Sequence, residues 1–77
     1  MILKVLVPTG TLLEEDVSIV TLPGAMGSFQ VLKGHAPLLS PLDRGKIVWK
    51  GDNPGSLDIS DGFVRVENDL ITVCAEL

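Results

Sequence analysis

The stretch VRVENDLITV (residues 64–73) decides the fold, because it joins two segments of alternating apolar and polar residues through a tight turn. Asn68 and Asp69 separate the segments, and both residue types tolerate the positive φ angles that a type I′ turn requires. A loop of this length also determines which residues of the two strands lie opposite one another. The expected pairs are Val66 with Ile71 and Val64 with Val73 on the core face, and Arg65 with Thr72 on the other face.

The rest of the chain repeats this alternation, and no apolar face recurs with the period of a helix. Turn residues such as Pro8-Thr9-Gly10 and Asn53-Pro54-Gly55 separate the segments. Short strands with such regular turns are typical of a sandwich or flattened barrel. We therefore predict an all-β fold without helices, in one domain that spans residues 1–77. The residues expected on inner faces outside the hairpin include Leu3, Val5, Val7, Ile47, Trp49, Leu57 and Ile59.

Two neighbouring segments depart from the simple alternation. Residues 17–22 are nearly all β-branched or apolar, so we expect a strand that is covered on both faces. Pro23 and Gly24 then end that strand. Residues 24–39 read GAMGSFQVLKGHAPLL, with three glycines and weak alternation, and we expect a loop there. A loop this rich in apolar side chains needs another surface to cover it.

Composition excludes several classes of partner. The net charge is -4 and the six lysine and arginine residues are spread along the chain, whereas nucleic acids and anionic lipids require clustered basic residues. No apolar run approaches the ~20 residues that span a bilayer, and Met1 leads directly into a strand pattern without a targeting peptide. We therefore expect a soluble chain that binds no nucleic acid. The single cysteine, Cys74, is expected to be a buried and unreactive thiol.

Patterns that carry catalysis or bind metals are missing. A structural zinc site needs about four Cys or His ligands, and the chain has one residue of each type. Phosphate-binding loops and nucleophile elbows are also absent. We therefore predict no metal, no cofactor and no catalytic residue.

Two other functions remain open at this point. A small hydrolase would need a triad built from Ser28 or Ser40 with His35 and Asp43, whereas the simpler interpretation makes His35 a turn residue whose ring bonds nearby backbone. A free-standing barrel that binds sugars or other small ligands would use exposed aromatic rings, and Trp49 is the only aromatic candidate for such a platform.

The phrase GHAPLL at residues 34–39 resembles the G-H-A-P-L-L signature of the epsilon subunits of F-type ATP synthases, called delta in mitochondria. The preceding residues 27–32 resemble the family's G-x-F-x-V-L. Residues 42–47 are similar to L-x-x-G-x-I, residues 62–66 to G-F-x-E-V, and residues 72–76 to the end of V-T-V-L-A-E. The resemblance runs in the family's order along nearly the whole chain.

This resemblance implies a flattened two-sheet β-sandwich of about ten short strands, as in the amino-terminal domain of a non-catalytic rotor subunit. The implied partners are the gamma subunit and the c subunits of the membrane rotor ring, through which alone the membrane would be contacted. The implied location is the cytoplasmic side of a bacterial cell membrane, with a chloroplast thylakoid form as the alternative. The sequence ends at Leu77, where the family continues into a pair of helices.

The resemblance also indicates where the partners bind. It assigns them to the apolar segment around the GHAPLL phrase, while Leu32 is left open between this surface and the core. Ser28, Gln30 and Lys33 stand where many relatives carry an acidic residue, a glycine and a proline. The expected partner-binding residues are Met26, Ser28, Phe29, Gln30, Val31, Lys33, His35, Ala36, Pro37 and Leu38.

Overall fold

Eight strands and their turns account for the whole chain in the computed structural model, which describes residues 1–77 and contains no helix. The all-β prediction is therefore confirmed. There are eight strands rather than about ten, in part because one of them runs unbroken for 15 residues. The strands are β1 (Ile2–Val7), β2 (Gly10–Gly24), β3 (Gly27–Leu32), β4 (Leu38–Leu42), β5 (Gly45–Gly51), β6 (Gly55–Ile59), β7 (Asp61–Glu67) and β8 (Leu70–Glu76).

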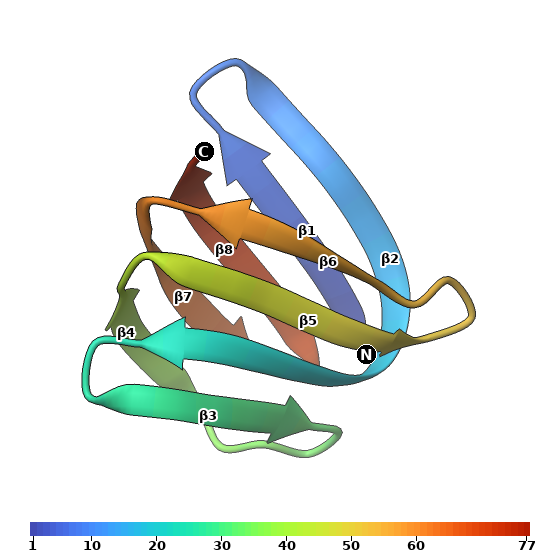
Figure 1. Cartoon of the computed structure of the whole chain (residues 1–77). Helices are drawn as coiled ribbons and strands as arrows, with labels where there is room; N and C mark the ends of the chain where they lie inside the picture. Colours follow the sequence, from blue (N-terminus) through green and yellow to red (C-terminus); the bar gives the residue numbers. More distant parts are fainter.

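The strands form two layers that share the long strand β2 (Figure 1). The front sheet consists of β3, the second half of β2, β5 and β6, while the back sheet consists of β4, β7, β8, β1 and the first half of β2. Strand β2 passes between the layers at an irregularity between Val17 and Ile19, since bulges let a strand bend and change sheets. The molecule measures 26 × 24 × 17 Å, as expected for a flattened sandwich.

The core lies between the two layers and contains only apolar side chains, with no buried polar or charged residue. Trp49 is buried, and its indole Nε1–H donates a hydrogen bond to the Asn53 carbonyl at 2.9 Å. Val7 and Leu57 are only half-buried. In the case of Val7, the pairing of β1 with β2 shifts between Val5 and Leu6, which breaks the alternation. The fully buried members of the core are Leu3, Val5, Val20, Leu22, Val31, Ile47, Val64, Val66, Ile71 and Val73.

The β7–β8 hairpin confirms the sequence prediction in detail. Asn68 and Asp69 have φ angles of 50° and 59°, which are the left-handed values of a type I′ turn. Val66 pairs with Ile71, and the pairs Val64–Val73 and Arg65–Thr72 follow in the expected register. This hairpin occupies the middle of the back sheet, with β4 on one side and β1 on the other.

Two segment predictions are wrong. Residues 17–22 are covered on one face only: Val20 and Leu22 are buried while Ser18 is exposed, because no third layer lies outside the front sheet. Residues 24–39 are not one loop, since they contain β3 and the start of β4, and only residues 33–37 connect these strands. Small and polar residues weaken the alternation of β3, so the pattern gave little sign of a strand.

Candidate partner-binding surfaces

The structure separates the predicted partner-binding residues into distinct regions. Met26 lies in the tight turn between β2 and β3, whereas residues 33–37 form the loop at the other end of β3 (Figure 1). A strand rises about 3.3 Å per residue, so the six residues of β3 hold the turn and the loop about 20 Å apart. These residues therefore do not form one compact site.

Along β3, inward and outward side chains alternate, and this corrects the prediction for Val31. Val31 is fully buried, so its side chain is not available to a partner. Phe29 points the same way and packs, half-buried, against the core. Ser28 and Gln30 are exposed as expected, and Leu32, whose position was left open, is 52% exposed.

The loop at residues 33–37 is exposed throughout. Its backbone turns back on itself, because the His35 N–H donates to the Leu32 carbonyl at 3.1 Å. The His35 ring Nδ1 lies 2.7 Å from the Ala36 carbonyl oxygen, to which it donates as the protonated nitrogen. The interpretation of His35 as a turn residue that bonds nearby backbone is confirmed. Leu38, the next residue, begins β4 and is half-buried.

The alternative functions receive no support from this geometry. The His35 ring makes no hydrogen bond with Ser28, Ser40 or Asp43, and the Ser40 hydroxyl instead donates to the Pro41 carbonyl at 3.1 Å. No group of three or more His, Cys, Asp or Glu side chains lies close enough together to hold a metal ion. The buried position of Trp49 also leaves no exposed indole platform for a sugar.

The outer face of the back sheet carries an apolar row that the sequence analysis did not single out. Phe63 of β7 lies opposite Pro41 of β4 on one side and opposite Cys74 of β8 on the other. Leu6 of β1 lies opposite Cys74 in turn. Adjacent strands are about 4.8 Å apart, so these four residues, here called the apolar row, cross four strands without a gap. Phe63 is 49% exposed although it is aromatic.

A shallow hollow of about 410 Å³ lies along the apolar row at its β1 end. Leu6, Phe63 and Cys74 line it, together with Val7 and Pro8 from the turn after β1. Cys74 is partly exposed there, so the prediction of a buried thiol is wrong. The hollow is open and mainly apolar, and a protruding side chain of another protein is the kind of group that would fill it.

Polar side chains border the apolar row on both sides. On one border, Arg65 lies opposite Thr72 and its Nη2 forms an ion pair with the Glu67 Oε2 at 2.6 Å. On the other border, Asp61 and Glu76 lie opposite each other and place two exposed carboxylates beside the hollow. An apolar centre with a polar rim is typical of the surface that one protein presents to another.

The register of the β7–β8 hairpin could have revealed half of this row. Once Arg65 is paired with Thr72 on the outer face, Phe63 and Cys74 must lie opposite each other on the same face two residues further. An exposed phenylalanine facing a cysteine was thus implied by the sequence pattern. The position of Leu6 was not, because it depends on the parallel pairing of β1 with β8, which joins the two ends of the chain.

Comparison with known proteins identifies the family. Residues 1–77 match the family described as ATP synthase, Delta/Epsilon chain, beta-sandwich domain. The ATP synthase epsilon chain of Magnetococcus marinus is 39% identical over 75 residues, which are 96% of this chain and 55% of that relative. The epsilon chain of Desulfosudis oleivorans is 41% identical over 76 residues, or 96% of this chain and 57% of that one. This chain therefore spans little more than half the length of these relatives.

Solved structures show the same fold in more distant proteins. A chain in the central stalk and c-ring structure of the mitochondrial ATP synthase from Tetrahymena thermophila superposes with a TM-score of 0.84 at 16% identity, covering 100% of this chain and 63% of that one. For a chain of the Euglena gracilis mitochondrial ATP synthase the TM-score is 0.88 at 22% identity, with coverages of 97% and 49%. No helix is present that is long and apolar enough to cross a membrane. Epsilon chains are non-catalytic subunits of ATP synthase, and by its sequence this chain belongs to the β-sandwich domain family of their delta and epsilon chains.

Proposed function

We propose that this chain is a non-catalytic rotor subunit of the central stalk of a proton-translocating F-type ATP synthase. It binds the gamma subunit and the c subunits of the membrane rotor ring, and it helps to couple proton flow to ATP synthesis. The observation that carries this proposal is the apolar row, which lies uncovered on the outer face of the back sheet. The chain that carries it belongs to the family of ATP synthase delta and epsilon β-sandwich domains.

The apolar row suits a permanent partner, which we take to be the gamma subunit. Stable protein interfaces bury about 800 Å² on each side and concentrate aromatic residues at their centre. Phe63 supplies such an anchor, and the hollow beside it accepts a side chain in return. Leu39, which is 70% exposed, extends the apolar area along β4. The carboxylates of Asp61 and Glu76 favour a partner that carries basic residues at this border.

The segment from Met26 to Leu38 is proposed to meet the c subunits of the rotor ring. Its available side chains are Met26 in the turn after β2, the outward residues of β3, and the exposed loop at residues 33–37. Val31 is excluded from this contact by its burial. Through the ring, the chain would lie at the cytoplasmic side of a bacterial cell membrane, in keeping with its bacterial epsilon-chain relatives.

A stiff scaffold suits a rotor part, because a soft one would yield under load. The two sheets enclose a core without a buried polar group, and close-packed protein interiors deform little. The chain forms 47 backbone hydrogen bonds, and 41 of them join residues of the strands. Torque applied at the apolar row would therefore pass to the segment 26–38 as movement of one rigid body.

Complex formation with gamma tests the proposed function. We expect the purified chain to form a one-to-one complex with the gamma subunit of an F-type ATP synthase at micromolar concentration, and to hydrolyse no ATP by itself. Size-exclusion chromatography with light scattering measures the mass and the stoichiometry. A chain that stays monomeric when mixed with an excess of folded gamma would contradict the proposal.

A further inference from the structure

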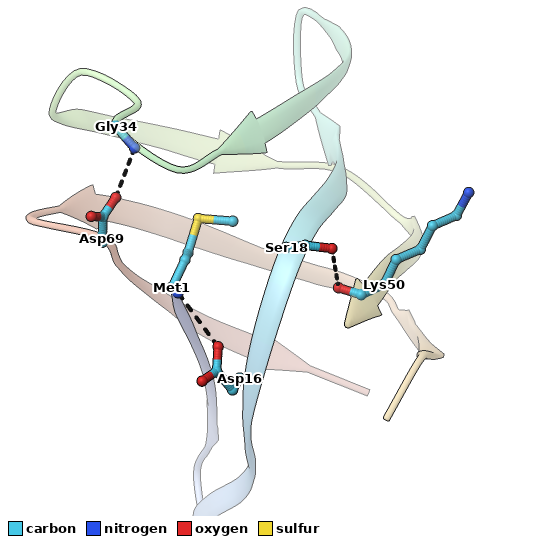
Figure 2. A network of polar contacts seen from close by, with 6 residues as sticks. All are labelled: Met1, Asp16, Ser18, Gly34, Lys50 and Asp69. Carbon is cyan, nitrogen blue, oxygen red and sulfur yellow. Dashed lines mark hydrogen bonds and ion pairs between the residues drawn. The ribbon is translucent and has the colours of Figure 1, made fainter. Parts of the chain in front are cut away.

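One side chain joins the loop at residues 33–37 to the β7–β8 turn by a hydrogen bond (Figure 2). The Gly34 N–H donates a hydrogen bond of 2.8 Å to the Oδ1 of Asp69, which lies 35 residues further along the chain. The other hydrogen bonds of the loop are local, from the His35 N–H to the Leu32 carbonyl and from the His35 ring to the Ala36 carbonyl. Strands β3 and β4 fix the two ends of the loop, and this bond is the one side-chain hydrogen bond that joins its middle to the β7–β8 turn.

Asp69 is itself fixed on two sides. It is the second residue of the type I′ turn between β7 and β8, with a φ angle of 59°. Its carbonyl oxygen accepts a hydrogen bond of 3.0 Å from the N–H of Ile2, at the start of β1. The carboxylate thus projects from a rigid hairpin in the middle of the back sheet, and a hydrogen bond from a backbone N–H to a carboxylate is stronger than one between neutral groups.

A glycine at residue 34 suits the backbone conformation that this hydrogen bond requires. Its φ angle of 80° is left-handed, which a glycine adopts without steric cost, and no atom lies within 4 Å of where a Cβ would be. The left-handed backbone at Gly34 therefore presents its N–H to Asp69 without steric cost. Without the carboxylate, an exposed loop of this kind would sample many conformations, and a partner would have to select one of them.

We propose that Asp69 is a positioning residue, which holds the loop at residues 33–37 in the shape that the rotor ring binds. This inference rests on the proposed function. Asp69 touches no partner itself. It acts from the β7–β8 turn by reducing the conformational freedom that binding would otherwise have to remove.

Three variants separate the side chain of Asp69 from the turn that carries it. D69G removes the carboxylate but favours the left-handed backbone, D69N keeps an Oδ1 acceptor, and N68G is the matched control at the neighbouring left-handed residue. The affinity of each is measured for purified gamma alone and for the purified gamma and c-ring complex in detergent. We expect D69G to weaken binding to the gamma and c-ring complex about tenfold, as the loss of a charge-assisted hydrogen bond predicts. N68G should stay close to the wild type, and D69N, which keeps a neutral acceptor, should lie between the wild type and D69G.

Two further readouts decide the outcome. The affinity of D69G for gamma alone should be unchanged, because the apolar row is not altered; a merely destabilised fold would weaken both. In the isolated chain, hydrogen exchange followed by NMR should show that the Gly34 amide loses protection in D69G and keeps part of it in D69N. Equal ring affinity of D69G and wild type, or an equal loss in N68G, would overturn the inference. A wild-type chain that fails to bind gamma would instead refute the proposed function.

Discussion

Replacing Phe63 with glutamate is expected to abolish binding to the gamma subunit while leaving the sandwich folded. Phe63 is 49% exposed on the outer face of the back sheet, so water can solvate a carboxylate there in the free chain. In the complex the same carboxylate would be buried without a partner, which costs several kcal/mol, and an aromatic anchor worth about 2 kcal/mol or more would be lost. We expect the affinity to fall at least about 100-fold, measured by isothermal titration calorimetry.

Val48→Glu is the matched control for this prediction. Val48 is also an exposed apolar residue in the middle of a strand, at 37% exposure, but it lies in β5 of the front sheet. The same change of charge there should leave binding to gamma intact. Phe63→Leu, which keeps an apolar group in the row, should retain most of the affinity. If Phe63→Glu bound gamma as tightly as the wild type, the apolar row would not be the interface.

Replacing Ile71 with alanine is expected to remove a large part of the free energy of unfolding. Ile71 is fully buried, and β8 carries it between Val66 of β7 and Leu3 of β1. Truncating a buried isoleucine to alanine costs about 2–5 kcal/mol. A domain of this length has a total stability of only about 4–11 kcal/mol, so one such cavity removes much of it. Urea denaturation followed by Trp49 fluorescence measures the change in the free energy of unfolding.

Two neighbouring variants test whether the loss comes from the cavity. Ile71→Val removes a single methylene and should cost about 0.5–1.5 kcal/mol. Thr72→Ala alters the next residue, whose side chain lies on the outer face opposite Arg65, and should change the stability by less than about 0.5 kcal/mol. An Ile71→Ala variant as stable as Thr72→Ala would show that β8 does not pack into the core as described.

The parts of the fold that could be predicted are those that neighbouring residues determine. The β7–β8 hairpin is encoded within ten residues, because Asn68 and Asp69 accept left-handed angles and a two-residue turn leaves one register. Inner and outer faces followed from alternation for the same reason. The continuous course of β2 was not predictable, since its bulge depends on pairing first with β1 and then with β5.

The candidate surfaces were less predictable because they depend on contacts between distant segments. The family phrase predicted a partner-binding segment, but it could not show that Val31 points inward and Leu32 outward. That difference is set by the turn at residues 25–26, which determines the register of β3 on β2. Likewise, the hydrogen bond from the Gly34 N–H to Asp69 joins residues that are distant in the sequence and become neighbours only when the back sheet has formed.

Cys74 provides the most direct measurement of whether the outer face of the back sheet is covered by another subunit. It is the only cysteine of the chain, it lies in the apolar row, and it is partly exposed. Its rate of reaction with a maleimide can be followed by mass spectrometry in the free chain and in the complex with cysteine-free gamma. We predict that the thiol reacts readily in the free chain and is protected at least about tenfold when gamma is bound. Equal rates in the free and bound chain would contradict the claim that gamma covers the outer face of the back sheet.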